Sequence, residues 1–156
     1  MKSAAKLPAV QAVLFDAYGT LFDVYSVGLL AEQLFPGKGD ALSLLWRDKQ
    51  IDYTRLVSMS GRYQPFWDLT RAGLRYAAAR LKLDLTPERE TQLLNQYRHL
   101  SAFPENKPVL QALKARGVAT GILSNGDPQM LGISVRSAGL DGLLDHVISV
   151  DVVQKY

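Results

Sequence analysis

The stretch VLFDAYGTLFDV, residues 13–24, places an acid directly after a short apolar run. The apolar residues from 9 to 15 fit a strand that is buried on both faces of a parallel sheet, and Asp16 follows that strand at once. Gly19 permits a tight turn after the acid, and Thr20 can donate a hydrogen bond that fixes the Asp16 carboxylate. A carboxylate held at a strand end can act as a nucleophile, although a lone Asp before a Gly turn more often only caps the turn.

The segment from residue 25 to about residue 100 has a helical pattern with no stretch that is typical of a strand. Its apolar residues recur at helical spacing. TPERE, residues 86–90, adds a Thr cap, a Pro at the first helical position and acids in the first turn. We therefore expect an all-helical insertion over residues 25–100.

Strands and helices alternate in the last third of the chain. We expect a helix over 109–116 that ends at Gly117, a strand over 118–123, a helix from 128 to about 138 that Asp127 caps, and a strand over 147–150. Such alternation requires crossover connections and a parallel sheet. The predicted fold class is α/β, with a Rossmann-like parallel core (residues 1–24 and 101–156) and a helical cap (residues 25–100) inserted after the first strand.

Polar residues follow two strands of the predicted sheet, in DAYGT after the first strand and SNGDP after the second. Ligands of open parallel sheets bind beyond the carboxyl ends of the strands. We therefore expect Asp16 and Ser124 to lie close together in the folded chain.

Composition excludes several classes of protein. The 156 residues include no Cys, which removes disulfides and Cys zinc sites and suits a reducing cytoplasm. No apolar run reaches the length of a membrane span, and the N-terminus lacks the pattern of a secretory signal. The net charge of +3 is spread over scattered bases, so we expect no nucleic-acid groove, and a modest positive field suits a small anionic substrate.

Three motifs in order, FDAYGTLFDV, LLWRDKQIDY and ILSNGDPQML, resemble the haloacid dehalogenase superfamily. Most members of that superfamily are magnesium-dependent phosphatases with a second Asp two residues after the nucleophile, where this chain has Tyr18. A halide leaves without a proton donor or a metal, whereas phosphoryl transfer benefits from both. The sequence therefore resembles the L-2-haloacid dehalogenase branch (haloacid dehalogenase type II) more closely, which implies no cofactor and no metal.

The resemblance also implies a reaction and a role for each matched residue. Asp16, which Thr20 orients, attacks an L-2-haloalkanoate, and hydrolysis of the aspartyl ester gives a D-2-hydroxy acid. Arg47 lies near the halogen and stabilises the charge that develops on the halide. Ser124 binds the substrate carboxylate, and Asn125 contacts the halide or the carboxylate. Tyr18 and Phe66 form the pocket wall. Taken alone, Arg47 fits a solvated helix face, Ser124 and Asn125 fit an ordinary loop, and the two aromatic residues fit a core.

The chain departs from the family pattern at its end, VDVVQKY. The family continues from the tyrosine into Lys-Pro, so its lysine would follow Tyr156, and Lys155 is out of register with it. The family's last motif and final sheet strands are also missing. We therefore expect an N-terminal part of an enzyme that is inactive by itself, with a non-catalytic truncated product or a magnesium-dependent phosphatase as the alternatives. The resemblance further implies a homodimer formed through helices.

Overall fold

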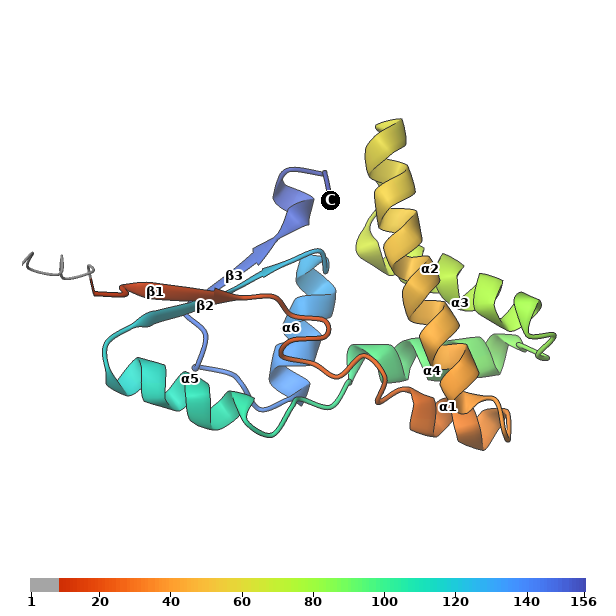
Figure 1. Cartoon of the computed structure of the whole chain (residues 1–156), viewed down its shortest axis with the longest axis horizontal. Helices are drawn as coiled ribbons and strands as arrows, with labels where there is room; N and C mark the ends of the chain where they lie inside the picture. The colour runs from red at the N-terminus through yellow and green to blue at the C-terminus, as the bar shows by residue number, and fades with distance from the viewer. Residues whose placement is uncertain (1–8) are drawn as a thin grey trace, which may run out of the picture.

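The computed structural model describes residues 9–156, and its centre is a three-stranded parallel sheet (Figure 1). The strands are β1 (Ala12–Phe15), β2 (Ala119–Ser124) and β3 (His146–Ser149), in the spatial order β1-β2-β3. Phe15 pairs with Ile122, so the carboxyl ends of β1 and β2 lie side by side. The predicted α/β fold with a parallel sheet is confirmed.

Two helices connect the strands and lie on one side of the sheet (Figure 1). They are α5 (Asn106–Ala115), which leads into β2, and α6 (Pro128–Ser137), which joins β2 to β3. Successive right-handed crossovers in one direction place both helices on the same face. The predicted start of α5 at Val109 is wrong, since Pro108 falls in the first turn, where its missing N–H removes no helical hydrogen bond. The predicted cap of α6 is confirmed, because the Asp127 carboxylate accepts from the Met130 N–H at 2.9 Å.

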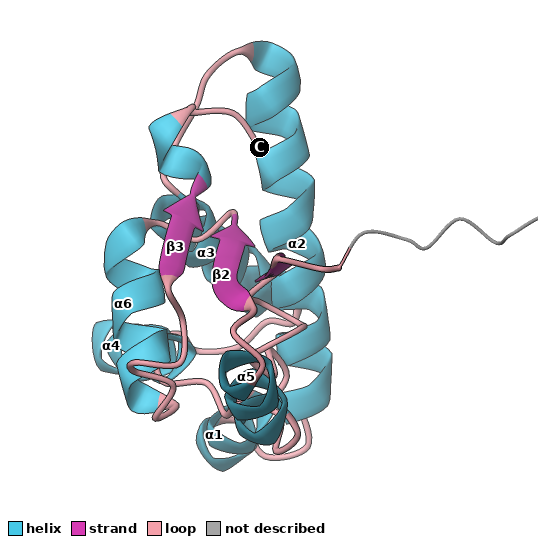
Figure 2. Cartoon of the chain, turned by 90° about the vertical axis from the view of Figure 1, so that its left-hand side faces the viewer, coloured by secondary structure: helices cyan, strands magenta, loops and turns pink. Residues whose placement is uncertain are grey.

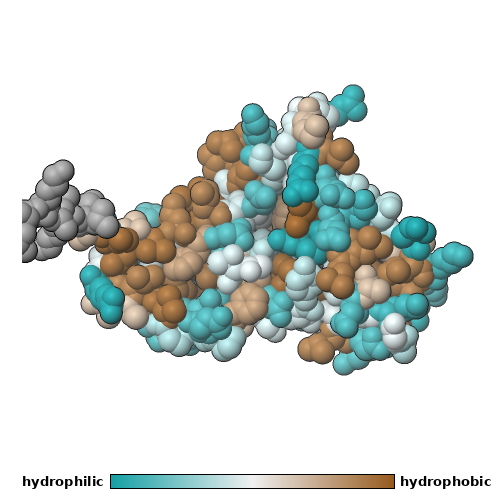
Figure 3. Space-filling model, viewed as in Figure 1, coloured by the Kyte–Doolittle hydropathy of each residue, from teal (hydrophilic) through white to brown (hydrophobic). Residues whose placement is uncertain are grey.

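The prediction that β1 is buried on both faces is wrong for the described chain. β1 is an edge strand, and α5 and α6 cover only one face of the sheet, so Leu14 is 52 % exposed. The strand register puts Leu14 on the same face as Leu123 and Ile148, which are also largely exposed. Figure 3 shows apolar residues gathered where Figure 1 draws β1 and the sheet.

Four helices lie between β1 and α5 in the sequence and form a group beside the sheet (Figures 1 and 2). They are α1 (Gly28–Leu34), α2 (Gly39–Ser60), α3 (Phe66–Arg80) and α4 (Pro87–Arg98). As predicted, Thr86 caps α4, where its hydroxyl accepts from the Arg89 N–H at 3.3 Å. The assignment of residues 25–100 to a separate cap domain stays a prediction. None of the helices in the described part of the chain is long and apolar enough to cross a bilayer.

The chain after β3 turns toward the insertion. Strand β3 ends at Ser149, one residue earlier than predicted, because the Ser149 hydroxyl accepts from the Asp151 N–H at 3.1 Å and caps a 3₁₀-helix, η1 (Val150–Val152). The segment then reaches α2, where the Tyr156 N–H donates to the Ser58 hydroxyl at 3.2 Å.

A close approach in the core joins the loop after β1 to the loop after β2. A Cβ added at Gly126 would lie 2.6 Å from Cε2 of Tyr18 and 3.1 Å from Cδ2 of Leu131, both of which belong to buried side chains. Only a glycine lets Tyr18 pack against this loop.

We therefore expect Gly126→Ala to lower the free energy of unfolding by about 1–3 kcal/mol, because the extra methyl group overpacks the core. Gly132→Ala is the control. A Cβ at position 132 in α6 would meet only the Arg136 side chain, at 3.4 Å, and alanine raises helix stability by up to about 1 kcal/mol over glycine. Urea unfolding of both variants measures the difference, and equal stability of the two would contradict the packing argument.

Candidate active site

The turn after β1 holds the Asp16 carboxylate at the end of the sheet. Gly19 has φ +104°, which only glycine adopts readily, and its N–H donates to the Phe22 carbonyl at 2.8 Å. The Thr20 hydroxyl donates to Oδ2 of Asp16 at 3.3 Å, the contact that the sequence predicted. Within the described part of the chain, Thr20 is the residue whose side chain forms a hydrogen bond with the Asp16 carboxylate.

The loop after β2 brings Ser124 and Asn125 to the same edge of the sheet. Ser124 is buried, and its hydroxyl oxygen accepts from the Gly126 N–H at 3.1 Å. That contact leaves the hydroxyl proton free to donate to a ligand. Asn125 is exposed beside it.

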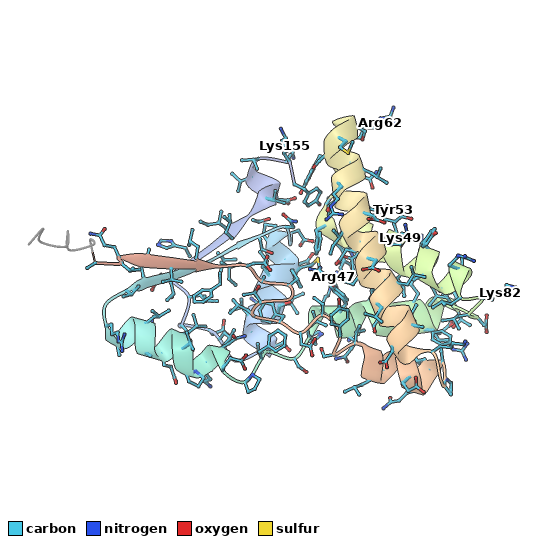
Figure 4. The ribbon with its side chains drawn as sticks, viewed as in Figure 1. Arg47, Lys49, Tyr53, Arg62, Lys82 and Lys155 are labelled. Carbon is cyan, nitrogen blue, oxygen red and sulfur yellow. The ribbon has the colours of Figure 1, made fainter. Side chains whose placement is uncertain are left out.

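Arg47 reaches the sheet from the middle of α2 (Figure 4). Its Nη2 donates to the Tyr18 carbonyl at 2.8 Å and its Nη1 donates to Oε1 of Gln50 at 2.7 Å. The solvated-helix interpretation of Arg47 is therefore wrong, because two fixed contacts hold the guanidinium against the loop after β1.

These elements enclose a cavity of about 60 Å³. Its lining residues come from the loop after β1, from α2, from the start of α3 and from the loop after β2: Asp16, Tyr18, Arg47, Ile51, Thr54, Phe66, Ser124 and Asn125. All residues that the sequence predicted for the site are in this lining, apart from Thr20, which contacts Asp16. Their roles in chemistry stay predictions.

The sequence analysis missed Ile51 and Thr54. Both follow Arg47 along α2 at the spacing that repeats one face of a helix, so the helical pattern contains the signal that would have found them. Ile51 adds an apolar wall, and Thr54 adds a hydroxyl that donates to the Ile51 carbonyl at 2.7 Å.

A second hollow, of about 270 Å³, also includes Asp16 in its lining. It shares Asp16, Ser124 and Asn125 with the first cavity, and the rest of its lining comes from β2, β3 and the segment after β3: Leu123, Ile148, Ser149, Val150, Val152 and Val153. Lys155 lines neither hollow.

Tyr18 is part of an aromatic cluster and presents a neutral phenol. Its ring centroid lies 5.6 Å from that of Phe66 and 6.0 Å from that of Tyr97. Burial raises the pKa of Tyr18 above its ordinary value. Within the described residues its hydroxyl has no hydrogen-bond partner.

A second tyrosine joins the insertion to the segment after β3. The Tyr63 hydroxyl donates to the Asp151 carboxylate, and its ring packs 5.3 Å from Tyr156. Burial first, and the Asp151 contact second, raise the pKa of Tyr63 to about 12, so the phenol stays protonated and donates at neutral pH.

Residues 9–156 contain no group of three or more His, Cys, Asp or Glu side chains that could hold a metal ion. The expectation that the site needs no metal rests on Tyr18 and stays a prediction.

Residues 10–156 match the model of a hydrolase family described as haloacid dehalogenase-like hydrolase. The chain belongs to the haloacid dehalogenase-like hydrolases. This haloacid dehalogenase-like chain is 44 % identical over 147 residues to an (S)-2-haloacid dehalogenase of Pseudomonas sp. (strain YL), and 40 % identical to haloacetate dehalogenase H-2 of Moraxella sp. (strain B). The alignments cover 94 % of the chain but 63 % and 66 % of the two relatives.

Solved structures show the same relationship. A crystal structure of an L-2-haloacid dehalogenase superposes on the haloacid dehalogenase-like chain with a TM-score of 0.92 at 61 % identity, and the match covers 96 % of this chain and 67 % of that one. The L-2-haloacid dehalogenase of Xanthobacter autotrophicus with covalently bound chloropropionic acid matches with a TM-score of 0.88 at 38 % identity, over 95 % of this chain and 60 % of that one.

The environment of Tyr18 predicts that its ring contributes to the stability of the fold and that its hydroxyl group does not. We expect Tyr18→Phe to leave the free energy of unfolding unchanged or to raise it by up to about 1–2 kcal/mol, since it removes a buried group without a partner. Tyr18→Ala, which empties the cluster, is expected to lower it by about 3–5 kcal/mol. Thermal unfolding measures both changes, and a strongly destabilised Tyr18→Phe variant would show that the hydroxyl is bonded.

Proposed function

We propose that the protein hydrolyses L-2-haloalkanoic acids to D-2-hydroxy acids through an ester formed on Asp16. The observation that carries the proposal is the small cavity in which Asp16, Arg47, Ser124 and Asn125 lie together with an aromatic ring at position 18. The names of the relatives and the family membership support the same reaction class.

In the first step an oxygen of Asp16 attacks the α-carbon from the face opposite the halogen. Because the Thr20 hydroxyl donates a hydrogen bond to Oδ2, Oδ1 is the oxygen that is free to attack. A C–O bond forms, the carbon–halogen bond breaks, and the halide leaves with the electron pair, so no proton is transferred. The structure of a relative with covalently bound chloropropionic acid supports an ester of this kind.

In the second step water attacks the carbonyl carbon of the Asp16 ester. The bond between that carbon and the ester oxygen on the α-carbon breaks, and this oxygen, which came from Asp16, takes one proton of the water and becomes the product hydroxyl. Asp16 is released as a carboxylate that carries the oxygen of the water, and the second proton passes to solvent. The configuration at the α-carbon is inverted once, in the first step, and is not changed by the second.

The positive and polar groups of the cavity suit a haloalkanoate. Arg47 has five N–H donors, of which two contact Gln50 and the Tyr18 carbonyl, so three remain for the departing halide. In this proposal the free hydroxyl proton of Ser124 binds the substrate carboxylate, and the Asn125 amide binds the carboxylate or the halide.

The size and the walls of the cavity favour a short substrate. About 60 Å³ holds about four to six water-sized groups, at about 10–15 Å³ for each. Tyr18, Ile51 and Phe66 provide apolar walls for the carbon chain and for an uncharged halogen.

Asp16→Asn in the full-length gene product is expected to abolish halide release from L-2-chloropropionate while the melting temperature stays within a few degrees, because Asp16 is exposed. A single turnover of the wild type in H₂¹⁸O should place the label in Asp16 rather than in the hydroxy acid. Mass spectrometry of the Asp16 peptide reads the label. Label in the first-turnover product would mean that water attacks the substrate carbon and that no ester forms.

The choice between a dehalogenase and a magnesium-dependent phosphatase depends on Tyr18. A phenol whose pKa is raised by burial stays neutral, so it does not bind Mg²⁺ as an anion. Halide release is therefore expected to persist after dialysis against EDTA, within about twofold of the untreated rate. Loss of the rate with EDTA and its return with Mg²⁺ would favour metal-dependent chemistry.

Three further expectations from the sequence remain proposals. They are the division into a core (1–24 and 101–156) and a cap (25–100), a cytoplasmic location, and a homodimer formed through helices. If the full-length gene product releases no halide, the alternative of a non-catalytic truncated product is favoured.

A further inference from the structure

Gln50 is a fully buried amide that contacts three polar groups at the back of the cavity. Its Oε1 accepts from Nη1 of Arg47 at 2.7 Å and from the Tyr97 hydroxyl at 3.0 Å. Its Nε2 donates to the Thr70 hydroxyl oxygen at 2.6 Å. The solvent-exposed fraction of Gln50 is 0 %, so its amide is hydrogen-bonded by these side chains instead of by solvent.

The contacts of Gln50 continue into the helices around it. Thr70 donates its hydroxyl proton to the Phe66 carbonyl at 2.7 Å, and the Trp46 indole N–H donates to the Thr70 carbonyl at 2.7 Å. Gly73 permits this close packing of α3 on α2, because a Cβ there would lie 3.2 Å from the backbone nitrogen of Gln50 and 3.2 Å from the backbone carbonyl oxygen of Trp46. The Gln50 amide is thus fixed by α2, α3 and α4 together.

We propose that Gln50 is a positioning residue that holds the Arg47 guanidinium at the cavity. The inference rests on the proposed function only where it assigns Arg47 to the leaving halide. Two contacts on different nitrogens, Gln50 on Nη1 and the Tyr18 carbonyl on Nη2, fix both the place and the plane of the guanidinium. With Gln50 removed, one contact remains and the group can rotate about it.

The chemistry of the amide explains why a glutamine suits this position. A carboxylate could accept the same two hydrogen bonds, but it would pair with Arg47 and offset the positive charge that an anion meets. An apolar side chain would leave buried donors of Arg47 and Tyr97 without an acceptor. A neutral acceptor holds the guanidinium and leaves its charge available.

The test compares three variants of the full-length gene product. Gln50→Leu removes every side-chain contact, and Gln50→Glu keeps the acceptor for Arg47 and Tyr97, adds charge and removes the donor to Thr70. Thr70→Val is the control because it removes two buried hydrogen bonds of the same network, to Gln50 and to the Phe66 carbonyl, and it leaves the contact between Gln50 and Arg47 in place. Two readouts are measured: the ¹⁵N–¹H signals of the Arg47 Nη groups, assigned with Arg47→Lys, and kcat and KM for halide release from L-2-chloropropionate.

Gln50→Leu is expected to merge the separate Nη signals of Arg47, since the group rotates, and to lower kcat by about ten- to a hundredfold, as misplaced catalytic groups do. Gln50→Glu is expected to keep the signals separate and to raise KM by about tenfold, because the acceptor for Arg47 stays and a negative charge is added beside it. Thr70→Val is expected to lower the melting temperature as Gln50→Leu does, with the Arg47 signals and kcat within about twofold of wild type.

Separate Nη signals and unchanged kcat in Gln50→Leu would overturn the proposal. Equal losses of kcat in Thr70→Val and Gln50→Leu would also overturn it, because general loosening of the helices would then explain both. A wild type that releases no halide would overturn the proposed function, while the Arg47 signals would still report whether Gln50 holds the guanidinium.

Discussion

The hydrogen bond from Nη2 of Arg47 to the Tyr18 carbonyl joins two parts of the chain that the sequence separates by a loop and a helix. It fixes α2 against the turn that carries Asp16, and so it sets how far the cation lies from the carboxylate. A backbone carbonyl is a suitable partner, because it holds the guanidinium without adding a negative charge to the cavity. Together with the Tyr63–Asp151 and Tyr156–Ser58 contacts, this hydrogen bond holds the helices to the end of the sheet.

Aromatic packing supports that contact from behind. Tyr18 packs against Phe66 at the start of α3 and against Tyr97 in α4, and the Tyr97 ring lies 4.9 Å from Trp46 in α2. Trp46 and Tyr97 also contribute polar atoms to the network around Gln50. The apolar cluster and the buried amide therefore form one packed unit, in which Tyr18 and Phe66 provide the cavity wall and Gln50 supports Arg47.

The sequence predicted the parts of this protein that local chemistry determines. The alternation of strands and helices gave the parallel sheet, and the caps Thr86 and Asp127 marked helix starts that the structure places within a residue. It failed where the outcome depends on distant neighbours. An apolar run such as 13–15 does not reveal how many neighbours a strand has, so the exposure of Leu14 was not foreseen. Gln50 was missed for a related reason, since the sequence of one helix does not show which residues of a neighbouring helix a polar side chain contacts. The helical spacing from Arg47 could have indicated Ile51 and Thr54.

The charge of the site gives a physical reason for an aromatic residue at position 18. Asp16 and Arg47 face the cavity with opposite charges, and the described lining contains no other ionisable carboxylate or base. A second carboxylate at position 18 would lie beside Arg47 and would make the cavity anionic, which disfavours an anion unless a cation enters with it. The buried phenol of Tyr18 keeps the balance near neutral and the walls apolar. In the proposed reaction, a small anion then approaches Asp16 without a metal to offset charge, and Arg47 meets the charge that develops on the leaving group.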